Sequence, residues 1–150
     1  MIERQGSAVL VNEIVNHPEV HPWVCGPITG PLDLTESIED GSYIALMGEY
    51  GGFLFWNMGC GIYDAHSAIV PEGRGKWAID AAHEALRLIF EHGAREVMMS
   101  VPKGNIAVRA LVRCLKAKHR GNLENGWWRD GHFIPIDVYS MTRADYKKCP

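Results

Sequence analysis

The segment whose residue types point most clearly to a chemical role is a glycine-containing loop. It joins an apolar run to a helical pattern. Residues 69–78 read Ile-Val-Pro-Glu-Gly-Arg-Gly-Lys-Trp-Ala. The free N–H groups of a first helical turn and the helix dipole together favour an anion such as a phosphate. Gly73 and Gly75 permit close approach of the backbone, and Arg74 and Lys76 add positive charge. The segment matches neither a Walker loop nor a dinucleotide-binding fingerprint, so a plain turn also fits it.

Asp64 and His66 precede this loop and form a second candidate for chemistry. They are two residues apart in a strand-like stretch, which places both side chains on one face. An imidazole beside a carboxylate can accept a proton and pass it on near neutral pH. A hydrogen-bonded pair with a purely structural role at a strand edge fits the sequence equally well.

The cysteines and the paired histidines lack the spacing of metal ligands. No two cysteines form a Cys-x-x-Cys pair, so we expect free thiols in a reducing compartment at Cys25, Cys60, Cys114 and Cys149. His17 and His21 are four residues apart, but Pro18 and Pro22 interrupt the helix that would bring them to one face. We therefore predict no metal site.

Composition and charge set limits on the class of protein. The chain has 150 residues, 47% hydrophobic and 22% charged, which predicts one domain (1–150) with its own core. The net charge of -3 argues against a general nucleic-acid binder. The apolar runs 43–47 and 53–56 are too short to span a bilayer, and the run 7–11 is too short for a signal peptide. We expect a cytoplasmic protein with no membrane or nucleic-acid partner.

Hydrophobic periodicity predicts strands in the first half of the chain. Residues 7–11 favour a short strand, and the proline-rich connection after them has room for a helical turn near 34–39. Stretches 42–48, 52–57 and 61–70 are strand-like, and the short glycine-containing connection between the first two is typical of a hairpin. These three strands form an antiparallel meander.

The second half alternates helices and strands. A helix over 76–92 has an alanine-rich apolar face and ends at Gly93, and a buried strand follows at 97–101. Asn105 can cap a second helix over 106–118, after which the last two strands are expected at 123–128 and 133–142. The pattern predicts an α/β (α+β) fold, a mixed sheet with helices on its faces.

These features in this order resemble the GNAT acyltransferase superfamily, closest to its RimJ/RimL-type branch. The resemblance covers about residues 61–146 and depends on the loop 70–76, the helix after it, the strand 96–101, Asn105 and the ending 137–146. It implies a mixed, mostly antiparallel sheet of six to seven strands flanked by helices, with a central pair of parallel strands that splay apart.

The resemblance also implies an N-acetyltransferase that moves an acetyl group from acetyl-CoA to a primary amine by direct transfer. Gly73, Arg74, Gly75 and Lys76 would then hold the pyrophosphate, with the Trp77 indole beside it. Ile69 and Val70 would pair with the pantetheine amides, and an N–H near Val70 would stabilise the oxyanion. Asn105 would contact the cofactor arm, cap its helix, or do both.

The catalytic and acceptor residues follow from the same resemblance. Asp64 and His66 would handle the proton of the acceptor, a small-molecule or peptide amine. Aromatic residues frame the acceptor site or serve ordinary packing: His17, His21, Trp23, Trp127, Trp128 and His132. The basic stretch 103–120 would favour the cofactor's phosphates or form a solvated helix face. A homodimer is compatible with the resemblance.

Three departures from the family pattern keep other functions open. Trp77 stands where the loop usually has a second glycine, Lys116-Ala117 stands where a Gly-Phe pair is common, and no tyrosine lies within 106–118 to protonate the leaving thiolate. A GNAT-fold protein that binds acyl-CoA or a partner without efficient turnover is therefore the main alternative. An interaction module that binds another phosphate ligand, or none, is the third.

Overall fold

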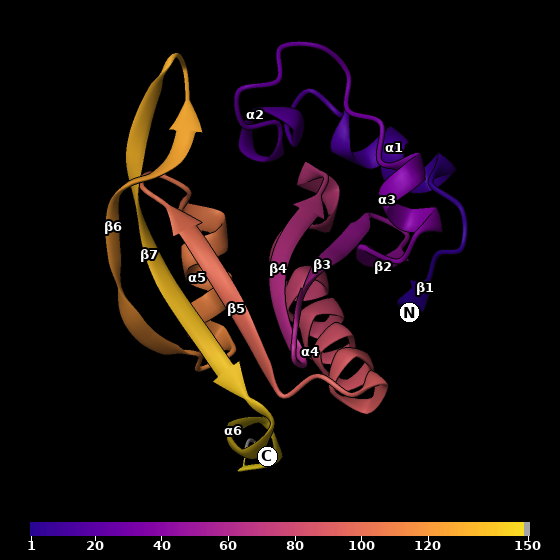
Figure 1. Ribbon diagram of the computed structural model, residues 1–150, viewed down its shortest axis with the longest axis vertical. Helices are drawn as coiled ribbons and strands as arrows, with labels where there is room; N and C mark the ends of the chain where they lie inside the picture. The colour runs from indigo at the N-terminus through magenta and orange to yellow at the C-terminus, as the bar shows by residue number, and fades with distance from the viewer. Residues whose placement is uncertain (149–150) are drawn as a thin grey trace.

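A seven-stranded sheet runs through the computed structural model, which describes residues 1–148 (Figure 1). Its strands lie in the order β1-β2-β3-β4-β5-β7-β6. The strands are β1 (Glu3–Arg4), β2 (Tyr43–Gly48), β3 (Gly51–Gly59), β4 (Ile62–Ile69), β5 (Glu96–Pro102), β6 (Lys118–Arg129) and β7 (His132–Thr142). The helices are α1 (Val9–Val15), α2 (His21–Val24), α3 (Thr35–Glu39), α4 (Lys76–His92), α5 (Ile106–Cys114) and α6 (Arg143–Lys148), with a 3-10 turn, η1 (Pro71–Gly73), before α4.

One parallel pair interrupts an otherwise antiparallel sheet. β4 and β5 pair in parallel from Ile62 with Glu96 to Ala65 with Met99, whereas every other neighbouring pair is antiparallel. Pairing stops there, although β4 continues to Ile69 and β5 to Pro102, and the two strands separate (Figure 1). The predicted mixed sheet with a central splayed parallel pair is confirmed.

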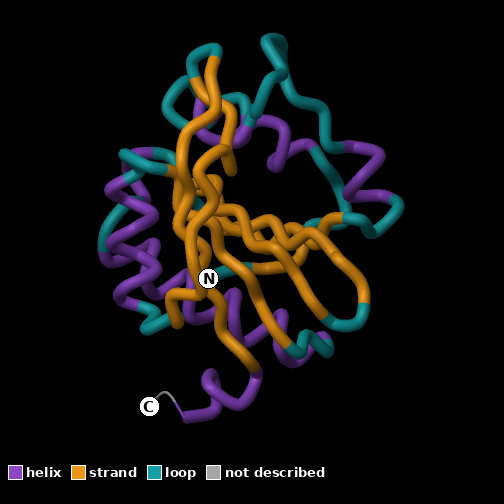
Figure 2. Tube along the Cα trace, turned by 60° about the vertical axis from the view of Figure 1, so that its left-hand side comes forward, coloured by secondary structure: helices purple, strands orange, loops and turns teal. Residues whose placement is uncertain are grey.

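Helices lie on both sides of the sheet (Figure 2), and an apolar cluster fills the space on each face. One packs α4 and α5 against the face that carries Phe53, Phe55 and Val97. The other packs α1 and the segment around α3 against the opposite face, which carries Met47 and Leu54. The sheet is therefore the middle layer, and the separation of β4 from β5 is a gap between the two outer layers.

The long helix α4 has the predicted bounds. Its apolar face and the glycine that ends it, the two signals in the sequence, are both present in the structure. Its buried face is small near the start and larger toward the end: Ala78, Ala81, Ala82, Ala85, Leu86, Ile89 and Phe90. The small residues allow the helix to approach β3, which it contacts. Gly93 ends the helix at a φ of 120°, a value that disfavours residues with a Cβ atom.

Two predicted elements differ from the structure. Residues 7–11 were expected as a strand, but α1 begins at Val9, because Val11, Ile14 and Val15 are buried at helical spacing. The helix expected over 106–118 ends at Cys114, because Lys116 adopts a φ of 57° and turns the chain into β6. β6 consequently begins at Lys118 rather than at residue 123.

Two other expectations concern the whole chain. No helix in the described part, residues 1–148, is long and apolar enough to cross a membrane. Cys25, Cys60 and Cys114 are free, as expected, and Cys149 lies outside the described residues.

Shortening Ile89 tests whether α4 anchors the core. Ile89 is 1% exposed, so Ile89→Ala should lower the free energy of unfolding by about 2–5 kcal/mol through lost burial and a residual cavity. Ile106→Ala is the matched control, because Ile106 is 79% exposed and should change stability by no more than about 0.5 kcal/mol. Urea unfolding measures both, and equal destabilisation of the two variants would contradict this core.

Candidate functional site

The first turn of α4 presents free backbone N–H groups. Gly75 occupies the N-cap position at a φ of 90°, and no side chain caps the helix there. The N–H of Arg74 donates to the Pro71 carbonyl, and the first helical bond runs from Ile79 to Gly75. Among the described residues, the N–H groups of 76–78 have no hydrogen-bond acceptor. These donors and the dipole of a 17-residue helix are suited to an anion.

The Trp77 indole lies against the β2–β3 turn instead of blocking this anion site. It contacts the Tyr50 ring edge-to-face, with ring centroids 5.3 Å apart. A Cβ atom added to Gly48 would be 3.2 Å from its Cζ2 atom, so the indole also packs on the β2–β3 connection. Gly73 is required by the same packing, because a Cβ atom there would collide with Tyr50. The indole expected beside the pyrophosphate is thus on the protein side of the loop.

A cleft of about 360 Å³ extends from the start of α4 to α5, and residues 19–23 at the start of α2 form a further wall. Its lining includes Glu19, Trp23, Ser67, Ile69, Arg74, Gly75, Ala78, Gly104, Asn105, Ala107 and Cys114. Arg74 reaches across to donate to the Glu19 carbonyl at 3.2 Å, whereas Lys76 points to solvent and pairs with Asp80. The cleft therefore has one guanidinium at its rim and mainly backbone donors within.

Ile69 and Val70 offer their backbone groups to different sides. The Val70 N–H donates to the Tyr50 carbonyl at 3.0 Å, so it faces β3. Because hydrogen-bonding direction alternates along a strand, the backbone groups of Ile69 and Ser67 face β5, where pairing has ended. The amide next to the open gap is consequently that of Ile69, and the N–H of Val70 is already occupied.

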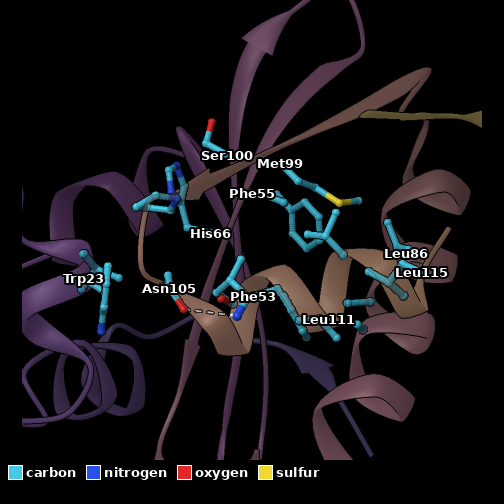
Figure 3. Close-up of a pocket in the computed structure, with 18 of the residues that line it drawn as sticks. Trp23, Phe53, Phe55, His66, Leu86, Met99, Ser100, Asn105, Leu111 and Leu115 are labelled. Atoms are coloured by element: carbon cyan, nitrogen blue, oxygen red, sulfur yellow. Dashed lines mark hydrogen bonds between the residues drawn. The ribbon is translucent and has the colours of Figure 1, made fainter. Parts of the chain in front are cut away.

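Asn105 caps α5 at the other wall of the cleft. Its Oδ1 accepts a hydrogen bond from the Val108 N–H at 3.2 Å (Figure 3). Its side chain also lines the cleft and a smaller cavity behind it. The capping role predicted for Asn105 is present, and the same side chain borders the space where a ligand would lie.

The smaller cavity, of about 70 Å³, lies where β4 and β5 separate and continues toward α4 and α5. Figure 3 shows Phe55, Leu111 and Leu115 toward one end of this cavity and Trp23 and His66 toward the other. Trp127 also lines it. The cavity therefore has an apolar end among the helices and a polar end at the sheet.

Asp64 and His66 lie within ion-pair distance of each other at the polar end of the cavity. His66 Nε2 is 3.3 Å from Asp64 Oδ2, and both side chains are about one-fifth exposed, at 23% and 20%. The second oxygen, Asp64 Oδ1, is buried without a partner in the described structure. Burial and, to a smaller extent, the charge of Asp64 raise the pKa of the neighbouring Tyr43. His66 lines the cavity, with Asp64 behind it.

Only some of the expected aromatic residues reach this cavity. Trp23 and Trp127 line it, and the Arg129 guanidinium stacks on Trp23 at 3.3 Å from the ring centroid. The others make local contacts elsewhere: Trp128 packs on Phe133, His132 contacts the Asp130 carbonyl, His21 contacts the Gly30 carbonyl, and His17 accepts from the Glu19 N–H. Tyr43 and Arg129 were not expected in the site, because no sequence spacing connects them to it.

The basic stretch 103–120 is partly neutralised by the protein itself. Arg109 and His119 both contact Asp137, at 2.9 and 3.2 Å, and their hydrogen bonds lower the pKa of that carboxyl. Lys118 pairs with Asp145. This arrangement fits a solvated helix and hairpin surface better than a concentrated phosphate site.

Comparison with solved structures identifies the fold. Spermidine N-acetyltransferase from Vibrio cholerae, in complex with CoA and spermine, aligns over 99% of this chain and 98% of its own, with a TM-score of 0.77 and 12% identity. The structure of yncA from Salmonella typhimurium with its cofactor acetyl-CoA aligns over 95% of this chain and 92% of its own, with a TM-score of 0.75 and 14% identity. Mycobacterium smegmatis RimJ in complex with CoA-disulfide aligns over 96% of this chain and 86% of its own, with a TM-score of 0.69 and 16% identity.

Neither a protein-family model nor a curated protein sequence matches the chain. The structural likeness therefore carries the assignment: the chain has the GNAT fold, as the sequence resemblance implied, and RimJ is among its structural neighbours.

Two substitutions of Asn105 separate its capping role from any contact with a ligand. Asn105→Ala should lower the free energy of unfolding by about 1 kcal/mol, because the Val108 N–H loses its acceptor. Asn105→Ser should keep most of that stability, since serine also caps helices. Urea unfolding of both variants checks this, and equal loss of stability in the two would contradict the capping role.

Proposed function

We propose that this protein is an N-acetyltransferase that moves the acetyl group of acetyl-CoA to a primary amine by direct transfer, within a single acyltransferase-like domain. The observation that carries the proposal is the set of free N–H groups at 76–78, at the mouth of a cleft that continues to the gap between β4 and β5. A diphosphate fits such donors, and a narrow chain fits the gap.

The cleft has the parts that CoA requires. The first turn of α4 and Gly75 would hold the pyrophosphate, with Arg74 at the rim. The free backbone carbonyl of Ile69 would accept a hydrogen bond from a pantetheine amide, as a neighbouring strand does. Asn105 borders the path on the opposite wall. Structural neighbours with CoA, acetyl-CoA or CoA-disulfide bound support this type of donor.

His66 and Asp64 would manage the proton of the amine. Acetyl-CoA supplies a thioester whose C–S bond breaks, releasing a thiolate, as the amine nitrogen bonds to the acyl carbon. His66 lines the cavity and would accept the proton that the nitrogen loses, while Asp64, whose Oδ2 is 3.3 Å from Nε2, would orient the imidazole. The N–H of Ile69, which faces the gap, replaces that of Val70 as donor to the developing oxyanion.

The entrance beside Trp23 and Trp127 would admit the acceptor. The aromatic walls beside His66 suit a cationic amine that becomes neutral before it reacts. The acceptor is accordingly a small-molecule or peptide amine.

One observation favours a second function, binding of acyl-CoA or a partner without efficient turnover. No tyrosine lies on α5 or in the sequence around it, so the usual proton donor for the leaving thiolate has no counterpart at that place. The two functions share the cleft and differ in turnover alone.

Binding of CoA is the first test of the site. Acetyl-CoA at about 100 times its dissociation constant should stabilise the fold by about 2.7 kcal/mol, seen as a thermal shift of several degrees. Gly75→Ala should weaken CoA binding about tenfold or more, because alanine is strained at a φ of 90° and would displace the donor loop.

Gly93→Ala is the matched control for Gly75→Ala. Gly93 has a φ of 120°, so alanine is strained there too, but it lies at the far end of α4. Both variants should lose stability, and calorimetry should show weaker CoA binding only for Gly75→Ala. Unchanged affinity in that variant would refute the anion site.

Turnover tests the roles of Asp64 and His66. His66→Ala should lower kcat by about 10²–10⁴-fold while leaving acetyl-CoA affinity unchanged, because His66 acts on the amine proton. Thiol release from acetyl-CoA with spermine, lysine and a short peptide measures it. Unchanged turnover in both His66→Ala and Asp64→Asn would remove the pair from the mechanism. If the native protein binds acetyl-CoA and releases no thiol with any amine, the binding function stands instead.

A further inference from the structure

The apolar end of the inner cavity has no role in the reaction described above. Acetyl transfer needs space for two carbons at the gap between β4 and β5, but the cavity continues beyond it between α4 and α5. Its far walls are Ala82, Ala85, Leu86, Leu111, Val112 and Leu115. Protein interiors are close-packed, so a space of this kind next to a ligand cleft requires an explanation.

The cavity exists because small side chains on α4 face larger ones on α5. Ala82 and Ala85 are 2% and 1% exposed, so both are fully inside the protein, yet neither fills the space opposite Leu111 and Val112. None of the side chains that line the cavity is Asp, Glu, Lys or Arg. The polar side chains that line it, among them His66, Ser100 and Asn105, belong to the end at the sheet. The end between α4 and α5 is apolar, and an apolar space of this kind favours an apolar occupant over water.

The cavity is continuous with the cleft proposed for CoA. Five residues line both spaces: Trp23, Ser67, Asn105, Val108 and Leu111. A group attached to the end of a ligand in the cleft therefore reaches the cavity without opening the core. The whole cavity, its polar end included, has a volume of about 70 Å³, roughly five to seven times the 10–15 Å³ that one water-sized group occupies.

We propose that this cavity binds the acyl chain of the donor, an unbranched aliphatic chain of about four to six carbons, in preference to acetyl. The inference rests on the proposed function, because it requires the cleft to bind CoA, and it changes the preferred donor from acetyl-CoA to a longer acyl-CoA. It adds that the α4–α5 space is an acyl pocket, with Ala85 and Val112 at its wall setting the length that fits.

A series of CoA thioesters tests the pocket in the native protein. Dissociation constants for CoA, acetyl-CoA, butanoyl-CoA, hexanoyl-CoA and dodecanoyl-CoA are measured by calorimetry. Each buried methylene should tighten binding about fourfold, so butanoyl-CoA should bind about 15-fold more tightly than acetyl-CoA. Dodecanoyl-CoA should gain nothing beyond hexanoyl-CoA, since its chain exceeds the pocket. Butanoyl and hexanoyl thioesters that bind within twofold of acetyl-CoA would overturn the proposal.

Filling the pocket gives a second, independent measurement. Ala85→Leu should remove the advantage of butanoyl-CoA over acetyl-CoA while leaving the affinity for free CoA unchanged. Ala81→Leu is the matched control: Ala81 is buried on the same helix but does not line the cavity, so the preference for longer chains should persist. If Ala85→Leu weakens CoA and butanoyl-CoA by the same factor, the space belongs to the path of CoA and the proposal is wrong. Ala85→Val repeats the test with less overpacking.

The two proposals fail in different ways. If neither CoA nor acetyl-CoA binds the native protein, the proposed function is wrong and the acyl pocket falls with it. If both bind and chain length has no effect, the acyl pocket alone is wrong.

Discussion

Hydrogen bonding between the parallel strands β4 and β5 stops at Ala65 and Met99, and the site depends on this limit. Up to that point the sheet is continuous and separates its two outer layers. Beyond it, the backbone of Ile69 faces an open gap instead of a neighbouring strand. Backbone groups at an unpaired strand edge must bond to water or to a ligand, and under the proposed function the amides of pantetheine would take this place.

The two helices that flank the gap divide the remaining work. α4 begins at Gly75 with free N–H groups, and its alanines allow it to lie close to β3. α5 begins at Asn105, whose side chain is used by its own cap. The two helix starts are therefore different: no side chain caps α4, whereas Asn105 caps α5 and forms a wall of the cleft.

The sequence predicted the parts of this site that depend on local patterns. Apolar periodicity and Gly93 place α4 correctly, and the loop before it was recognised from Gly73 and Gly75. Tertiary contacts were beyond reach, since the direction of the Trp77 indole depends on Tyr50, and the capture of the Val70 N–H depends on a carbonyl in another turn. The end of α5 was predicted too late because Lys116 adopts a positive φ, which turns the chain into β6. A lysine in the sequence gives no indication of this conformation.

The contact between Arg129 and Trp23 has a kinetic consequence. It joins the β6–β7 hairpin to the single turn α2 beside the polar end of the cavity, whereas the anion-binding loop lies at the start of α4. Trp23 lines both the cleft and the cavity, so under the proposed function the amine would lie on its Trp127 side and the thioester on its Gly75 side. Neither has to leave before the other enters, so the reaction would pass through a ternary complex, and double-reciprocal plots would intersect rather than run parallel.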